Sequence, residues 1–314
     1  MTNEQKNQQL VVSLTDSSSI SSSSSKDNNN VVTPARVGGK ASSLAKLFAI
    51  DGLGSSVVPK AYALTVDFFQ PWINEMKESV NFKSLTALQI KDGDKKESSE
   101  EEELLLCKKL QATSYDLTLS KEQTNVIQML TDEMNSNSWN VPNLAAVRSS
   151  APEEDGVISS FAGAFDTCLG VSSTFDALEK AIHTCFASLW DYRVLHYKQM
   201  NNAIASGSNN NSTDDNSNIV GGFAVVVMEM IDSQIAGVAF SANPLNSDRD
   251  ELVIDSVSLL YQVFFVNYLL LRSGSFSSFH TYHLSNSLFL SPTLSRTHLL
   301  SHLPIILPLS PSPT

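Results

Sequence analysis

Apolar residues recur every three or four positions in two stretches of the chain, which is the spacing of one face of an α-helix. The first stretch, residues 41–50, follows two glycines and predicts a short helix whose N-terminus is preceded by a glycine turn. The second stretch, residues 174–200, predicts a long amphipathic helix. We interpret the long helix as a packing element rather than a catalytic one.

β-Branched and apolar residues fill segments 223–230 and 235–240, a composition typical of strands. Because only a short polar connection separates them, the pattern predicts a β-hairpin. Residues 252–257 predict the next strand. Helices mixed with antiparallel strands indicate an α+β domain rather than a regular βαβ array.

Polar residues dominate three segments of the chain. Residues 1–30 are rich in Ser and Asn, residues 91–103 are nearly all charged or Ser, and residues 201–218 are mostly Asn, Ser and Asp. Such segments bury too little apolar surface to offset the entropy of the chain. We therefore predict a disordered N-terminal tail and two solvated inserts within an ordered domain at residues 31–257.

The composition changes abruptly at residue 258. Residues 258–314 contain no Asp, Glu or Lys, but they contain four of the six histidines and five of the eleven prolines. This difference predicts an atypical tail that is unstructured or aberrant. The apolar run at 257–271 is shorter than the roughly 20 residues that cross a bilayer, so a membrane span is disfavoured, although this alternative stays open.

Charge and cysteine content exclude several classes of protein. A net charge of -12 and a pI near 4.9 argue against a protein that binds nucleic-acid backbone. Cys107, Cys168 and Cys185 are widely spaced and form no C-x-x-C pair, so neither a disulfide framework nor a zinc site is indicated. The N-terminus lacks the apolar core of a signal peptide. We expect a reducing, cytoplasmic setting.

The first candidate for chemistry is the segment Val37-Gly38-Gly39-Lys40. Two glycines let the backbone approach a ligand closely, and a lysine at a helix start adds a positive charge, which suits a polyphosphate. A plain loop is the alternative reading of so short a motif.

The second candidate is Arg148-Ser149-Ser150, which follows an apolar, strand-like segment. Arginine offers a rigid pair of donors that binds phosphate oxygens. The alternative is an ion pair between Arg148 and one of the nearby acids, which are Glu153, Glu154 and Asp155.

The third candidate is the small-residue loop at 159–163, whose backbone N–H groups could face an anion and whose glycine would allow the loop to close. Read alone, this segment is only a turn.

The fourth candidate is the end of the segment 225–230, where backbone groups near Glu229 and Met230 could contact a purine between apolar side chains. A buried core strand is the alternative reading.

Taken in order, these segments resemble the N-terminal nucleotide-binding domain of the phosphoenolpyruvate synthase and pyruvate phosphate dikinase family, over roughly residues 31–257. The resemblance rests on VGGKASSLAKL, VVPKAYALTVDFF, CFASLWDYRVLHY and VVVMEMIDSQIAGVAFSANP. It is strongest in AAVRSSAPEEDGVISSFAGAFDTCLGV, which favours the synthase branch.

The resemblance implies an ATP-grasp-like fold and an ATP-dependent phosphotransferase that phosphorylates a carrier histidine en route to phosphoenolpyruvate. Lys40 and Arg148 would contact ATP phosphates as the catalytic residues. Other implied ATP-binding residues are Gly38 and Gly39 in the glycine turn, Ser149 after the arginine, Ser160, Phe161, Ala162 and Gly163 in a phosphate lid, and Glu229 and Met230 at an adenine hinge.

The chain departs from the family pattern after residue 257. The family continues with a Gly-Leu-Gly-Glu turn and an acidic strand that binds Mg2+, and its phosphohistidine and pyruvate domains are absent here. We therefore hypothesise a truncated or mis-spliced form of a longer enzyme, with metal ligands unknown and the acceptor (pyruvate, glucan or antibiotic) open. The alternative function is a catalytically inactive, truncated nucleotide-binding protein.

Overall fold

The computed structural model describes residues 9–16, 31–52, 54–91, 97–136, 139, 143–152, 165–196, 221–233, 235–258, 264–272 and 275–284. These residues fall into two units, Met1–Ile231 and Asp232–Thr314. Within the described ranges, no helix is both long and apolar enough to cross a membrane.

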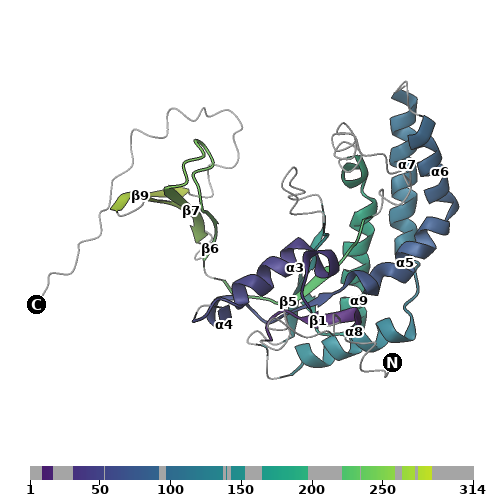
Figure 1. The fold of residues 1–314 in the computed structure, drawn as a ribbon, viewed down its shortest axis with the longest axis horizontal. Coiled ribbons are helices and arrows are strands. Elements are labelled where there is room, and N and C mark those ends of the chain that lie inside the picture. Colours follow the sequence, from purple (N-terminus) through teal and green to yellow (C-terminus); the bar gives the residue numbers. More distant parts are fainter. Residues whose placement is uncertain are drawn as a thin grey trace, which may run out of the picture. The chain divides into compact units, whose positions relative to one another are not determined.

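A five-stranded antiparallel sheet forms the centre of the first unit (Figure 1). The spatial order is β1-β2-β5-β3-β4, which places β5 in the middle. The apolar sequence of β5 suits this place, because a central strand covered on both faces needs a nearly continuous hydrophobic run. The strands are β1 (Val11–Ser13), β2 (Ala61–Leu64), β3 (Leu144–Ser149), β4 (Thr167–Ser172) and β5 (Val225–Glu229).

Helices cover both faces of this sheet. Val226 of β5 belongs to a small apolar cluster that includes residues of α3, whereas Val225 and Val227 belong to the large core with the other long helices. This division follows from the alternation of side chains along a strand. Figure 1 shows α6 and α7 side by side. The helices are α3 (Pro34–Phe48), α4 (Gly54–Val57), α5 (Val66–Glu78), α6 (Val80–Lys91), α7 (Glu97–Ser114), α8 (Lys121–Met134), α9 (Phe175–Ala187) and the 3-10 helix η2 (Ser188–Trp190).

An aromatic cluster joins α5 and α9 in the large core. Phe69 stacks on Phe186 with ring centroids 5.7 Å apart, and it meets Phe223 edge-on at 5.0 Å. Trp72 is also buried, and its indole N–H donates to the Thr118 carbonyl oxygen at 3.0 Å. Each such ring contributes about 1.5–3 kcal/mol by burial, so this cluster fixes the helices against the sheet.

The N-terminal tail is partly ordered, contrary to the expectation for residues 1–30. β1 pairs with β2 in antiparallel register, and Val12 and Leu14 are buried. The pattern Val11-Val12-Ser13-Leu14 is a short apolar strand inside a polar segment, and pairing with β2 satisfies its backbone. Residues 1–8 and 17–30 lie outside the described residues.

The predicted solvated insert at 91–103 is wrong over 97–103, which belong to α7. Its buried positions Glu103, Leu106, Cys107 and Leu110 have the spacing of one helical face. The glutamates at 100–102 are exposed. At residues 100–102, the charged run that indicated a solvated insert is therefore an exposed part of helix α7. The insert predicted at 201–218 lies outside the described residues.

The helix predicted at 174–200 is shorter than expected. It begins after Thr174, whose side chain accepts from the Ala177 backbone N–H, and α9 ends at Ala187. The chain continues as η2 and then turns extended at Asp191, where ψ is 135°. Residues 192–196 form a separate helical turn. The apolar spacing continued across a break in the backbone, so periodicity alone overestimated the helix.

A four-stranded antiparallel sheet with the order β6-β7-β8-β9 forms the second unit. The strand predicted at 252–257 is confirmed as part of β7. Strands β8 and β9 lie within 258–314, where we expected an unstructured tail. The strands are β6 (Ile235–Phe240), β7 (Glu251–Ser258), β8 (Phe264–Arg272) and β9 (Ser275–Leu284).

The predicted hairpin between β5 and β6 is wrong, because the two strands belong to different sheets. β5 pairs with β2 on one side and with β3 on the other. Both of its edges are therefore occupied, and β6 pairs with β7 instead.

Candidate functional site

Helix α3 contains a sharp break at the glycine pair. It starts earlier than the predicted residue 41, with Pro34 in the first turn, and Gly38 interrupts it with φ 80° and ψ 171°. A positive φ of this kind strongly favours glycine. The expected glycine turn before a helix at 41 is therefore present as a kink between two helical segments.

The kink packs against the end of β3. A β-carbon built on Gly38 would lie 1.8 Å from the Ser150 carbonyl oxygen, so no side chain fits there. The Ser150 hydroxyl donates to the Val37 carbonyl oxygen at 2.8 Å and accepts from the Ala41 N–H at 3.1 Å. The Gly39 N–H donates to the Ala151 carbonyl oxygen at 3.2 Å. Two sequence motifs that are 109 residues apart thus form one structural junction.

Lys40 extends from this junction to the end of β3. Its ammonium group donates to the Ser149 carbonyl oxygen at 3.2 Å, and its side chain is half-buried. A partly desolvated cation attracts an anion more strongly than one in bulk water. The structure therefore places the predicted lysine in contact with the Arg-Ser-Ser segment.

Arg148 lies on the face of the sheet that α3 covers. It is opposite Val226, which packs in the small cluster with α3. The Nε atom of Arg148 is buried and has no hydrogen-bond partner in the described part of the chain. An unpaired buried donor of this kind is costly unless a ligand or another group satisfies it. The alternative partners at 153–155 lie outside the described residues.

Ser149 and Ser150 have different roles, which the sequence did not distinguish. Ser149 is opposite Val225, so its side chain lies on the face away from Arg148. Its hydroxyl is buried and has no hydrogen-bond partner among the described residues. Ser150, which belonged to the second candidate segment but was given no ATP-binding role, holds the kink in place. The only sequence feature that pointed to Ser150 was its place as the second serine of the Arg-Ser-Ser motif.

Glu229 and Met230 lie at the other end of the strand pair from Arg148. Glu229 is opposite Ala145, three residues before Arg148, which is about 10 Å along the strand. The Glu229 N–H donates to the Lys60 carbonyl oxygen at 2.8 Å, and the Met230 N–H donates to the Leu144 carbonyl oxygen at 3.2 Å. Both amide donors are therefore already used in hydrogen bonds to neighbouring backbone carbonyl groups.

The predicted phosphate lid is not described, and the sequence leaves the metal ligands unknown. Ser160, Phe161, Ala162 and Gly163, the predicted phosphate lid, lie outside the described residues. In the parts of the chain that the structure describes, no group of three or more His, Cys, Asp or Glu could hold a metal ion.

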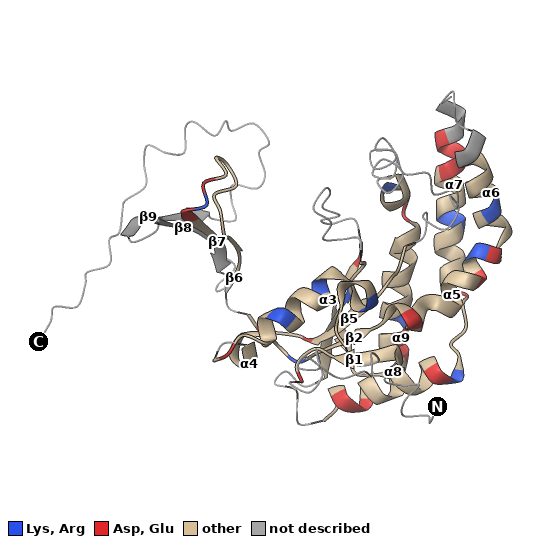
Figure 2. Cartoon of the chain, viewed as in Figure 1, with Lys and Arg blue, Asp and Glu red and all other residues tan. Residues whose placement is uncertain are grey.

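The charge on α3 is positive, although the chain as a whole is acidic. The helix carries Arg36, Lys40 and Lys46 and no acid, and its charged segments are all blue in Figure 2. Burial lowers the pKa of Arg36, and Asp67 opposes this effect. The Arg36 guanidinium donates to the carbonyl oxygens of Val31 and Gln9. Arg36 therefore has structural contacts, whereas Lys40 is the cation at the β3 end.

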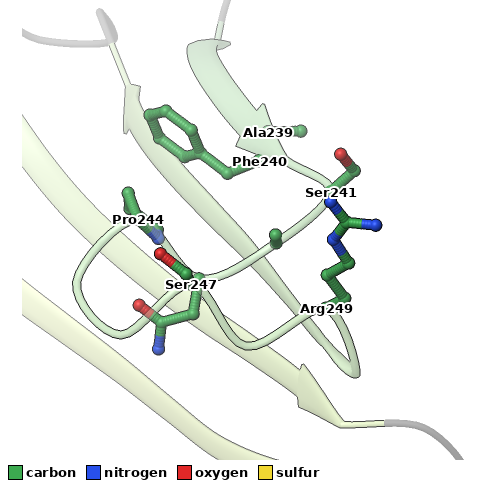
Figure 3. Close-up of a pocket in the computed structure, with 8 residues that line it drawn as sticks. Ala239, Phe240, Ser241, Pro244, Ser247 and Arg249 are labelled. Atoms are coloured by element: carbon green, nitrogen blue, oxygen red, sulfur yellow. The ribbon is translucent and has the colours of Figure 1, made fainter.

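The second unit has a shallow hollow of about 490 Å³ at the turn between β6 and β7 (Figure 3). In Figure 3, Ser241 and Arg249 lie next to each other, and Phe240 extends away from them. Ser247 in this turn has a φ of 61°. None of the predicted site residues lines the hollow. Its lining is Ala239, Phe240, Ser241, Ala242, Asn243, Pro244, Ser247 and Arg249.

Comparison with known proteins identifies a protein family whose sequence pattern matches this part of the chain. A family model described as pyruvate phosphate dikinase, AMP/ATP-binding domain, matches residues 34–259. This range contains both segments of the junction and the strand that ends at Glu229.

Three curated relatives are similar over parts of the chain. The rifampicin phosphotransferase of Bacillus subtilis is 27% identical over 221 residues, which is 70% of this chain and 22% of the relative. The phosphoenolpyruvate synthase of Aeropyrum pernix is 36% identical over 112 residues, or 36% of this chain and 12% of the relative. The prodigiosin synthesizing transferase PigC of Serratia marcescens is 40% identical over 111 residues, or 35% of this chain and 11% of the relative.

The matched part of the chain thus spans only about a tenth to a fifth of the length of these relatives. The family match, in contrast, covers most of the chain. The chain belongs to the family of pyruvate phosphate dikinase AMP/ATP-binding domains.

Proposed function

We propose that the first unit binds ATP as the nucleotide-binding part of a phosphotransferase, with the polyphosphate at the junction between α3 and β3. The observation that supports this most is the contact network joining Gly38, Gly39 and Lys40 to Ser149, Ser150 and Ala151. It brings a lysine and an arginine to one end of β3, where phosphate oxygens would be neutralised.

The chemistry of phosphoryl transfer fits these residues. Catalysis of this reaction depends mainly on positioning the phosphates and on stabilising the charge of their oxygens. Lys40 would bind as a point charge, and Arg148 would use its planar donors, including the unpaired Nε. Gly38 and Gly39 would allow close approach of the backbone.

Mg2+ would supply further positive charge to ATP. The described residues offer no ligand set for it, so the proposal assigns no metal ligand to this chain and no step to the metal. The lid at 160–163, the hinge at Glu229 and Met230, and the ATP-grasp-like arrangement remain predictions from the resemblance.

The acceptor is proposed to be a histidine on a separate domain, with phosphoenolpyruvate as the later product. The name of one relative, phosphoenolpyruvate synthase, supports this direction. The name of another, rifampicin phosphotransferase, supports a different final acceptor. The ATP-dependent first step that we propose for this chain is compatible with either final acceptor.

Calorimetric titration of the whole chain with ATP in the presence of MgCl2 tests the proposal. Micromolar binding is expected in the wild type. Lys40→Ala should weaken it about 10- to 100-fold, because a charge-assisted hydrogen bond contributes about 1.5–3 kcal/mol. Lys46→Ala, on the exposed side of the same helix, is the matched control and should bind like the wild type.

Two results would contradict the proposal. One is a folded wild-type chain that does not bind ATP. The other is equal affinity in Lys40→Ala and Lys46→Ala, which would show that the junction does not contact the phosphates.

A further inference from the structure

Two of the three cysteines form a pair between the edge of the sheet and a helix. Cys168 lies on β4, which is the edge strand next to β3, and Cys185 lies on α9. Both are free thiols, as is Cys107 on α7. Neither Cys168 nor Cys185 belongs to the proposed ATP site.

The contacts of the two thiols place them next to each other. The Cys185 sulfur is 3.6 Å from the Val147 carbonyl oxygen and 3.7 Å from the Asp166 carbonyl oxygen. Val147 is the residue opposite Cys168 in the ladder, and Asp166 is two residues before it. The Cys168 sulfur is 3.9 Å from the Ala181 carbonyl oxygen, one helical turn before Cys185. Each sulfur therefore lies among the neighbours of the other.

The two thiols differ in their surroundings. Cys168 is half-buried on an edge strand, whereas Cys185 is fully buried. The hydrogen bond from the Cys185 thiol lowers the pKa of Cys168 to about 7. The same hydrogen bond and burial raise the pKa of Cys185. Cys168 is therefore both the more exposed and the more acidic thiol of the pair, and the thiolate is the reactive form of a cysteine.

We propose that Cys168 and Cys185 form a peroxide-sensitive pair that closes reversibly to an intramolecular disulfide. The Cys168 thiolate attacks the terminal oxygen of a hydroperoxide, the O–O bond breaks, and the released alkoxide takes a proton to become an alcohol, or water when the oxidant is hydrogen peroxide. The Cys185 sulfur then attacks the Cys168 sulfenic acid. The S–S bond forms, the S–O bond breaks, and hydroxide leaves with the Cys185 proton as water.

This reaction is balanced, because two thiols lose two electrons and two protons while one hydroperoxide is reduced. A dithiol reductant reverses it by thiol–disulfide exchange. The disulfide ties the edge strand β4 to α9. It closes the chain segment from Cys168 to Cys185 into a loop. Closing this loop should raise the Tm by about 5–10 °C.

Peptide mapping of the wild-type chain after treatment with hydrogen peroxide tests the proposal without any substitution. We expect a Cys168–Cys185 cross-linked peptide with a mass lower by two hydrogens, which dithiothreitol abolishes. Cys107 provides the internal control, because burial raises its pKa to about 12 and it should stay reduced under the same treatment.

Two variants identify the order of attack. In Cys185→Ala, Cys168 should stop at the sulfenic acid and be trapped by dimedone. In Cys168→Ser, Cys185 should remain a free thiol. The proposal is overturned if the folded wild type keeps both thiols free under peroxide, if Cys107 oxidises as fast as Cys168, or if the only disulfide formed joins two chains.

Discussion

Gly38 and Ser150 are in direct backbone contact, and a β-carbon at position 38 would lie 1.8 Å from the Ser150 carbonyl oxygen. This contact connects helix α3 to the end of a strand more than a hundred residues later. It fixes where Lys40 leaves the helix relative to Arg148. The geometry of the proposed site therefore depends on the absence of a side chain at one position.

Gly38→Ala should destabilise the chain by more than about 2 kcal/mol, since the substitution adds both backbone strain and a clash. Gly52 is the matched control, because it also has a positive φ of 72° but nothing lies within 4 Å of its added β-carbon. Gly52→Ala should cost only about 1 kcal/mol. Urea denaturation of both variants measures the difference, and equal losses would show that the Gly38–Ser150 contact is not tight.

Substitution of Ser150 should destabilise the chain, whereas substitution of the neighbouring Ser149 should have little effect. Ser150→Ala removes two hydrogen bonds that hold the kink and should cost about 1–3 kcal/mol as well as ATP affinity. Ser149→Ala removes a buried hydroxyl without a described partner and should leave stability and ATP binding nearly unchanged. If instead Ser149→Ala lost ATP binding, its hydroxyl and not only its carbonyl would belong to the site.

Arg148→Met should be neutral or stabilising without nucleotide, because it removes an unpaired buried donor. The same variant should lose most of the rise in Tm that ATP gives the wild type. Arg148→Lys should not restore it, because lysine lacks the planar pair of donors. Thermal unfolding with and without ATP measures both effects. A strong loss of stability in the nucleotide-free variant would favour a structural ion pair for Arg148.

Tyr62 should make the chain sensitive to alkaline pH. Burial raises the pKa of Tyr62, and the nearby Glu133 raises it further. A group with a raised folded-state pKa stabilises the fold below its unfolded pKa of about 10 and loses this contribution as the pH rises above that value. Tyr62→Phe should therefore lose less stability than the wild type between pH 9 and pH 11. Urea midpoints at both pH values test this, and parallel losses would be inconsistent with it.

Several strands of the fold could be predicted from local patterns, but their partners could not. The apolar runs around Val226 and Val238 correctly predicted strands. The pattern did not show that β2 and β3 occupy both edges of β5, which excludes the hairpin with β6. Strand pairing depends on residues far away in the sequence, and periodicity reports only which face a residue lies on.

The candidate site shows the same limit. Residue type alone indicated Lys40 and Arg148 as phosphate-binding residues, and the structure brings their segments together. The roles of Ser149 and Ser150 depend on which face each occupies at the end of β3, and this follows from the register with β5. No local pattern contains that register.

If Lys40 and Arg148 bind the phosphates of ATP, calorimetry should distinguish their effect on ATP from their effect on adenosine. We predict that Lys40→Ala and Arg148→Met each weaken ATP binding about 10- to 100-fold, while the weaker affinity for adenosine is the same as in the wild type. Lys46→Ala should change neither. If both ligands lost affinity in parallel, the variants would be acting on the fold. If ATP and adenosine bound the wild type equally, the junction would not be a phosphate site.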